Sequence, residues 1–160
     1  MADMKISSVC NEKFKVNVIL KDSNGKVVLE KQAELNEQDE RFIAKLEADI
    51  EQVNVWDNHT PYLYSAYVEV VGENGTLLEV VPYEVGFRRL EIIDKVMYLN
   101  GKRLILLGVN RHEWSPRTGR CIGMEEMKSD MECILENNIN SVRTCHYPDQ
   151  IPWYYMCDKN

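Results

Sequence analysis

The sequence has no strongly basic segment and no long apolar run. Lys and Arg number 19 against 26 Asp and Glu, and the net charge of −7 is spread along the chain. Nucleic-acid binding needs clustered basic side chains that neutralise phosphates, and a membrane-spanning helix needs roughly 20 consecutive apolar residues. The opening, MADMKISSVCNEKF, also lacks the basic-then-apolar pattern of a signal peptide. We therefore expect a cytoplasmic protein with neither nucleic acid nor a membrane as its partner.

The sequence lacks the cysteine spacing of a zinc motif. The last four cysteines are about a dozen residues apart, whereas chelating pairs sit about two to four residues apart. The total is odd, which does not suit a framework of disulfides. We expect free thiols in a reducing cytosol. The cysteines are Cys10, Cys121, Cys133, Cys145 and Cys157.

Alternating apolar and polar residues predict β-structure over residues 1–90. In FKVNVIL (14–20), every second side chain is apolar, and DSNGK at 22–26 supplies a turn with Gly25 suited to positive φ. RFIAKLEADI (41–50) also alternates; an amphipathic helix is the alternative there, and we favour a strand. Strands separated by turns at short intervals predict an immunoglobulin-like antiparallel sandwich, although no Cys–Trp–Cys pattern is present.

Residues 91–160 have a different pattern. After a hairpin at Asn100–Gly101, the segment LILLGV (104–109) has no polar alternation, which predicts a strand buried on both faces. Apolar residues at helical spacing follow between Met124 and Leu135, then a short strand INSVRT (139–144) and a helix from Ile151. This β-α-β-α order is the repeating unit of a TIM barrel or an open α/β sheet, and two strands close neither. The predicted fold class is mainly β, a sandwich followed by a truncated β-α-β-α piece of a TIM barrel.

Two stretches in this second part resemble the signatures of family 2 glycoside hydrolases. They are NGKRLILLGVNRHEWSPRTGR at 100–120 and NNINSVRTCHYPDQIPWYYMCD at 137–158. The Arg-x-x-His-Tyr-Pro core of the family is present from Arg143 to Pro148. Gly-Val-Asn-Arg-His-Glu at 108–113 resembles β-galactosidases more than β-glucuronidases. The resemblance covers about residues 53–160 clearly and the first 50 by pattern alone.

The resemblance implies three substrate-binding residues, each at the end of an expected barrel strand. His112 matches a histidine that contacts sugar hydroxyls, Arg143 an arginine that orients the catalytic nucleophile, and His146 a histidine of the same sugar site. Barrel active sites are built at the carboxyl ends of the strands, which agrees with these positions. The spatial expectation is that Arg143 and His146 leave the strand next to the one that delivers His112.

The resemblance implies that the catalytic groups themselves are not in this segment. Retaining hydrolysis needs two carboxyl groups about 5–5.5 Å apart, and in this family both are glutamates on later barrel strands. Glu113 matches a different glutamate and is expected to be a structural hydrogen-bond acceptor. The family also implies magnesium and sodium, with ligands on other segments. Two histidines without a carboxylate at chelating spacing predict no metal site of the chain's own.

The expected function is therefore that of an inactive segment of a retaining β-galactosidase that acts on terminal β-D-galactosides. Another family 2 specificity, such as β-glucuronidase, is the first alternative. A stand-alone immunoglobulin-like module that binds carbohydrate or protein is the second, although no strand face gathers aromatic residues for sugar stacking. Because two parallel strands leave unpaired backbone edges, we also expect self-association of residues 100–160. Trp56 is expected to pack rather than to stack on sugars, and the same reading holds for Trp114 and Trp153 when the family motifs are set aside.

Overall fold

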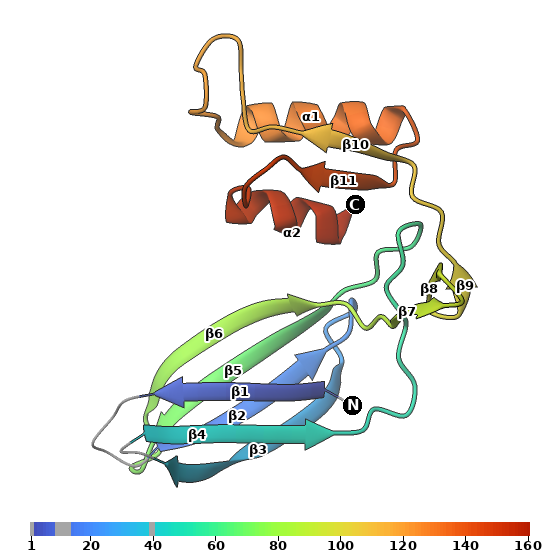
Figure 1. Cartoon of the computed structure of the whole chain (residues 1–160). Coiled ribbons are helices and arrows are strands. Elements are labelled where there is room, and N and C mark those ends of the chain that lie inside the picture. The colour runs from blue at the N-terminus through green and yellow to red at the C-terminus, as the bar shows by residue number, and fades with distance from the viewer. Residues whose placement is uncertain (1, 9–13, 39–40) are drawn as a thin grey trace. The chain divides into compact units, whose positions relative to one another are not determined.

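A computed structural model describes residues 2–8, 14–38 and 41–160. The chain divides into two compact units (Figure 1). The sandwich unit comprises residues 1–55 and 62–87, and the barrel unit comprises residues 56–61 and 88–160. Among the described residues, no helix has the length and apolar character needed to cross a membrane.

The sandwich unit is built from six antiparallel strands. Their order in space is β1-β4-β3-β2-β5-β6. The strands are β1 (Ala2–Ser8), β2 (Phe14–Lys21), β3 (Val27–Gln38), β4 (Arg41–Ala48), β5 (Tyr64–Gly72) and β6 (Leu77–Val85).

Strand β3 joins the two layers of this unit. Its first part, Val27–Ala33, pairs with β2, and its second part, Glu34–Gln38, pairs with β4. Strands β1 and β4 therefore form one layer and β2, β5 and β6 the other, as Figure 1 shows. A strand that changes sheets is a common way to close a sandwich. Buried side chains of both layers meet in one cluster, which consists of Phe14, Val16, Val18, Ala33, Ala44, Leu46 and Val68.

The local predictions for this unit are confirmed. Gly25 has φ +80° in the turn between β2 and β3, and the side chain of Asp22 accepts hydrogen bonds from the backbone N–H groups of Asn24 and Lys26, both at 2.9 Å. Segment 41–48 is a strand rather than a helix, and Ala44 and Leu46 are buried. The predicted inward position of Phe42 and the state of Cys10 lie outside the residues whose side chains are described.

The barrel unit starts with a small antiparallel sheet. Strand β8 (Val96–Leu99) pairs with β7 (Leu90–Ile93) and with β9 (Lys102–Arg103). The predicted turn at Asn100–Gly101 is confirmed, because both residues have positive φ, as the tight turns of hairpins require.

The β-α-β-α piece follows as predicted. Strand β10 (Gly108–Arg111) pairs in parallel with β11 (Ser141–Thr144), and the helices are α1 (Met124–Glu136) and α2 (Ile151–Lys159). Helix α1 carries Glu125 and Glu126 in its first turn, where negative charge favours the helix dipole. Asn138, with φ +54°, follows its end. The two helices pack on the sheet through a cluster of Ile122, Met127, Met131 and Trp153.

The prediction of a strand over 104–109 that is buried on both faces is wrong. The strand begins at Gly108, and Ile105, Leu106 and Leu107 are 52–59% exposed. The side chain of Asn140 explains the late start, because its amide accepts from the N–H of Leu107 at 2.8 Å and donates to the carbonyl of Ile105 at 2.9 Å. These bonds replace a strand ladder before Gly108, and among the described residues β11 is the single strand that pairs with β10.

Candidate functional site

The three predicted site residues follow or lie on the two parallel strands of the barrel unit. Asn110 of β10 is paired with Arg143 of β11, and His112 comes directly after β10. The pairing continues beyond the strand ends, because the N–H of Cys145 donates to the carbonyl of Arg111 at 2.8 Å. The chain thus leaves both strands at the same edge of the sheet, and the spatial expectation from the sequence is confirmed.

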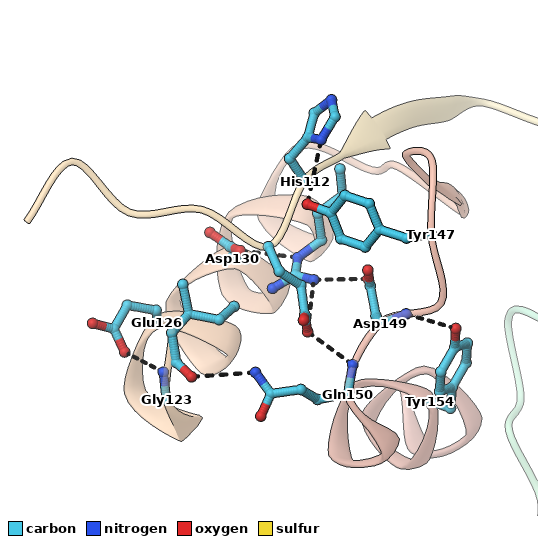
Figure 2. A network of polar contacts seen from close by, with 11 residues as sticks. His112, Gly123, Glu126, Asp130, Tyr147, Asp149, Gln150 and Tyr154 are labelled. Atoms are coloured by element: carbon cyan, nitrogen blue, oxygen red, sulfur yellow. Dashed lines mark hydrogen bonds and ion pairs between the residues drawn. The ribbon is translucent and has the colours of Figure 1, made fainter. Parts of the chain in front are cut away.

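The imidazoles of His112 and His146 lie edge to face. Their ring centroids are 5.7 Å apart with an interplanar angle of 85°. The hydroxyl of Tyr147 lies 3.4 Å from Nδ1 of His112, and Figure 2 shows these two side chains next to each other. Both histidines are exposed. Two rings that can donate or accept hydrogen bonds therefore face the solvent side by side.

Arg143 is exposed and points its guanidinium toward the same place. Its Nη1 lies 3.8 Å from Sγ of Cys145, the residue before His146. Among the described residues, no ion pair involves Arg143. Its charge is therefore not neutralised by a carboxylate within the described residues.

A buried arginine lies beneath this surface. Arg111 forms ion pairs with Asp149 at 2.8 Å and with Asp130 at 3.0 Å, and its guanidinium lies 3.7 Å from the ring centroid of Trp153. Arg111 and Asp149 are both 6% exposed. Arg111 ends β10 and Asp149 lies in the loop after β11, so this contact fastens together the two segments that carry the histidines (Figure 2).

Burial raises the pKa of Asp149 above that of an ordinary carboxyl, and the hydrogen bond and charge of Arg111 act in the opposite direction. The backbone around Asp149 is also fixed. Its N–H donates to the hydroxyl of Tyr154 at 2.9 Å. The N–H of Gln150 donates to Glu113 Oε1, also at 2.9 Å. The predicted role of Glu113 as a structural hydrogen-bond acceptor is confirmed.

From Arg111, the last residue of β10, onward, successive side chains alternate between the interior and the solvent. Arg111, Glu113 and Ser115 are buried, whereas His112 and Trp114 are exposed. Trp114 is 59% exposed, because this alternation turns it to the same side as His112, so the packing reading does not hold for it. Trp153 packs as predicted, and Trp56 donates its indole N–H to the carbonyl of Asp158 at 2.7 Å.

A cleft of about 630 Å³ lies elsewhere in the barrel unit. Residues of α1, α2 and segment 56–59 line it, among them Met131, Ile134 and Trp153, and none of the three predicted site residues does. Its walls include two of the side chains that form the apolar core under the helices. We therefore place the candidate site at the ends of β10 and β11, where the polar groups converge, and not in this cleft.

Comparison with known proteins agrees with this geometry. The model of glycosyl hydrolases family 2 matches residues 2–88, and the model of the TIM barrel domain of that family matches residues 90–160. The chain belongs to glycosyl hydrolase family 2. The fold class predicted from the sequence, a sandwich domain followed by the start of a TIM barrel, is thereby confirmed.

Relatives within family 2 include β-galactosidases and β-glucuronidases. The β-galactosidase large subunit of Lactobacillus acidophilus is 51% identical over 91% of this chain and 23% of its own length, and the β-galactosidase of Streptococcus thermophilus is 43% identical over 92% and 14%. The solved structure of Bifidobacterium dentium β-glucuronidase with coumarin-3-O-glucuronide has a TM-score of 0.85 at 27% identity, covering 91% of this chain and 24% of that one. The chain thus spans less than a quarter of the length of these relatives.

The metals that the family implies do not fit the one cluster of metal-binding side chains among the described residues. Magnesium and sodium are hard ions, and Mg²⁺ in particular prefers oxygen ligands. In the described residues, one group of side chains could hold an ion, namely His112, Cys145 and His146, which offer nitrogen and sulfur.

Sequence reasoning missed three residues of this region: Arg111, Asp149 and Cys145. Arg111 was named only as part of the family motif at 108–113, and Asp149 was not singled out. An arginine at the end of an apolar strand, with a carboxylate at the end of the next strand, is a signal that could have suggested the buried pair. Cys145 could have been found from its position next to His146.

Proposed function

We propose that this chain is the part of a retaining β-galactosidase that provides the sandwich domain and the first two strand–helix units of the catalytic barrel. The observation that carries the proposal is the parallel pairing of β10 and β11. This pairing brings the ring centroids of His112 and His146 to 5.7 Å from each other, beside Arg143. Barrel enzymes assemble their active sites at this end of the strands.

Each of the three residues has a role that its geometry supports. The exposed imidazoles of His112 and His146 donate to or accept from the sugar hydroxyls, whose hydrogen bonds strengthen in an oxocarbenium-like transition state. Arg143 lies beside the nucleophilic carboxylate of another segment and keeps it ionised, because a nearby positive charge lowers the pKa of a carboxyl. The acid/base and nucleophile glutamates come from that remaining part of the barrel.

The choice of galactoside over glucuronoside rests on sequence similarity. The β-galactosidases of Lactobacillus acidophilus and Streptococcus thermophilus are 51% and 43% identical to the chain, whereas the structurally similar β-glucuronidase is 27% identical. A β-glucuronidase is the alternative that the structural comparison supports.

The first experiment uses the chain alone. A nitrophenyl-β-galactoside assay should give the rate of the buffer, because the chain supplies groups that bind the sugar and none that break the glycosidic bond. Clear turnover, retained after a second purification step, would show that the catalytic carboxylates lie among these 160 residues.

The second experiment restores the rest of the barrel. Residues 1–160 replace the matching segment of Streptococcus thermophilus β-galactosidase in one hybrid and of Bifidobacterium dentium β-glucuronidase in another. We expect hydrolysis in the first hybrid and none in the second. Activity in the β-glucuronidase hybrid alone would favour the alternative.

Substitutions in the active hybrid test the individual roles. His112→Ala and His146→Ala should each lower kcat/KM by about 10–100-fold, since a lost hydrogen bond costs about 1–3 kcal/mol when its partner is left unpaired. The matched control is His59→Ala, because His59 is an exposed histidine of the same unit that belongs to neither strand end. It should leave kcat/KM unchanged.

A further inference from the structure

The ends of β10 and β11 bring three metal-binding side chains together. One ligand atom each from His112, Cys145 and His146 lies within 4.8 Å of the other two. Cys145 is 1% exposed and the two histidines are exposed. The thiol thus forms the floor of the cluster, and the imidazoles form its open side.

The donor set selects the class of ion. Two imidazoles and a thiolate suit zinc and similar borderline-soft divalent ions, and they do not suit magnesium or calcium. Sites with three protein ligands usually keep the fourth position of the tetrahedron for water or a substrate. The solvent side of this cluster provides that position.

The separations lie close to those of a bound ion. With Zn–N distances of about 2.0–2.1 Å and Zn–S of about 2.3 Å, tetrahedral ligands are roughly 3.4–3.6 Å apart. The ligand atoms, which lie within 4.8 Å of one another, therefore have to approach by up to about 1.4 Å. The exposed imidazoles can make this adjustment by rotation, whereas Cys145 stays in place.

The neighbouring groups are compatible with a cation. Arg143 Nη1 lies 3.8 Å from Sγ of Cys145 and would therefore lie close to an ion bound by that thiol. Its own positive charge opposes a divalent ion, but Arg143 is exposed and water screens this repulsion. The hydroxyl of Tyr147, 3.4 Å from Nδ1 of His112, can help to orient that ring, as outer partners of metal-bound histidines do.

We propose that His112, Cys145 and His146 form a binding site for a zinc-class divalent ion, with the fourth position open to solvent. The sequence predicted no such site because it offered two histidines without a carboxylate, and the third ligand is the buried thiol. An ion held here occupies the nitrogens that the proposed function assigns to sugar hydroxyls. Zinc and a galactoside therefore exclude each other at this site.

The test is metal binding by the 160-residue chain itself. Zinc is titrated calorimetrically, and cobalt is used as the coloured probe, because a cobalt–thiolate bond gives a charge-transfer band in the near ultraviolet. We expect one ion per chain and a thiolate band. His112→Gln, His146→Gln and Cys145→Ser should each weaken zinc binding by more than about a hundredfold, since losing even an outer partner costs about 10–100-fold.

Matched controls come from the same unit. Cys133→Ser removes an exposed thiol of α1, and His59→Gln removes an exposed histidine outside the cluster. Both should bind zinc as the unsubstituted chain does. Circular dichroism verifies the fold of each variant, and the two exposed histidines keep the test valid if replacement of buried Cys145 disturbs folding.

Three results would overturn the proposal: no saturable binding of one ion, binding that survives in both histidine variants, or a cobalt band that disappears with Cys133→Ser. The outcome is independent of the hydrolysis experiments. Zinc binding is measured on this chain without catalysis, and the sugar-binding role is measured in the hybrids without added zinc.

Discussion

The two units of the chain have different kinds of core. In the sandwich unit, the described residues that are buried are apolar, whereas the barrel unit buries the polar residues Arg111, Glu113, Ser115 and Asp149. These polar residues lie at or after the carboxyl ends of the two parallel strands, where the candidate site is. Apolar contacts in a core have no preferred direction. The hydrogen bonds of an arginine to fixed carboxylate partners do have one, so they orient the particular loops that they join. The barrel unit thus uses part of its interior to position functional groups.

The largest expected loss of stability comes from substitution of Arg111, the centre of the buried polar network with Asp149 and Glu113. Arg111→Met leaves Asp149 and Glu113 buried without their cation, and breaking a buried pair in this way costs about 3–5 kcal/mol. Hydrogen exchange of the amides in α1 and β11 measures this loss. Arg103→Met is the control, because Arg103 is exposed, and it should change the stability by no more than about 0.5 kcal/mol. Equal exchange in the two variants would contradict the importance of the network.

Replacement of a buried apolar side chain by Ala should lower the stability of either unit by a similar amount. Leu46 of β4 and Met127 of α1 are 6% and 1% exposed, and replacement of either by Ala should cost its own unit about 2–5 kcal/mol. Exchange of amides within the affected unit checks this. Leu135→Ala, on the same helix as Met127 but 43% exposed, should cost clearly less. A loss as large as that of Met127→Ala would show that α1 buries a different face.

The exposed apolar segment before β10 should govern self-association. Leu106 is 52% exposed, so Leu106→Lys should change the stability by less than about 0.5 kcal/mol while it lowers the tendency to associate. Light scattering over a concentration series measures this, with Thr118→Lys in an exposed loop as the control of equal charge. A clean monomer at high concentration without substitution would contradict the expected self-association.

The smallest expected effect is a pH dependence at the start of α1. The hydrogen bond from the N–H of Gly123 to the side chain of Glu126 lowers the pKa of this carboxyl. A lowered pKa stabilises the fold above the ordinary carboxyl range, and this contribution is lost as the pH falls through the lowered value. The difference in Tm between the unsubstituted chain and Glu126→Gln should therefore be present at neutral pH and disappear in acid. Glu125→Gln should show a smaller change.

The difference between the units also explains what the sequence could predict. Strands β2 and β4 and helix α1 follow from their periodicity, because their apolar faces pack in the way that the pattern indicates. The starts of β10 and β11 were less accessible, since the strands begin at Gly108 and Ser141 rather than at residues 104 and 139. The apolar run at 104–107 predicted a strand. The side chain of Asn140 instead forms hydrogen bonds with the backbone of this run, and the sequence pattern does not indicate such a contact.

The site was predictable in part for the same reason. His112, Arg143 and His146 were found through the family motifs, and the order of strand, helix and strand then placed them together. Arg111 and Asp149 are 38 residues apart in the chain, and their partnership depends on three-dimensional pairing. Cys145 was predicted to be a free thiol, which is confirmed, but its position beneath both histidines follows from the pairing of its N–H with Arg111.

A crystal structure of the active Streptococcus thermophilus hybrid with bound galactose tests the account most directly. The account predicts that the imidazoles of His112 and His146 lie within hydrogen-bond distance of hydroxyls of one sugar, with Arg143 against the carboxylate of the nucleophile. A sugar bound elsewhere in the barrel, with neither histidine in contact with it, would contradict the site described at the ends of β10 and β11.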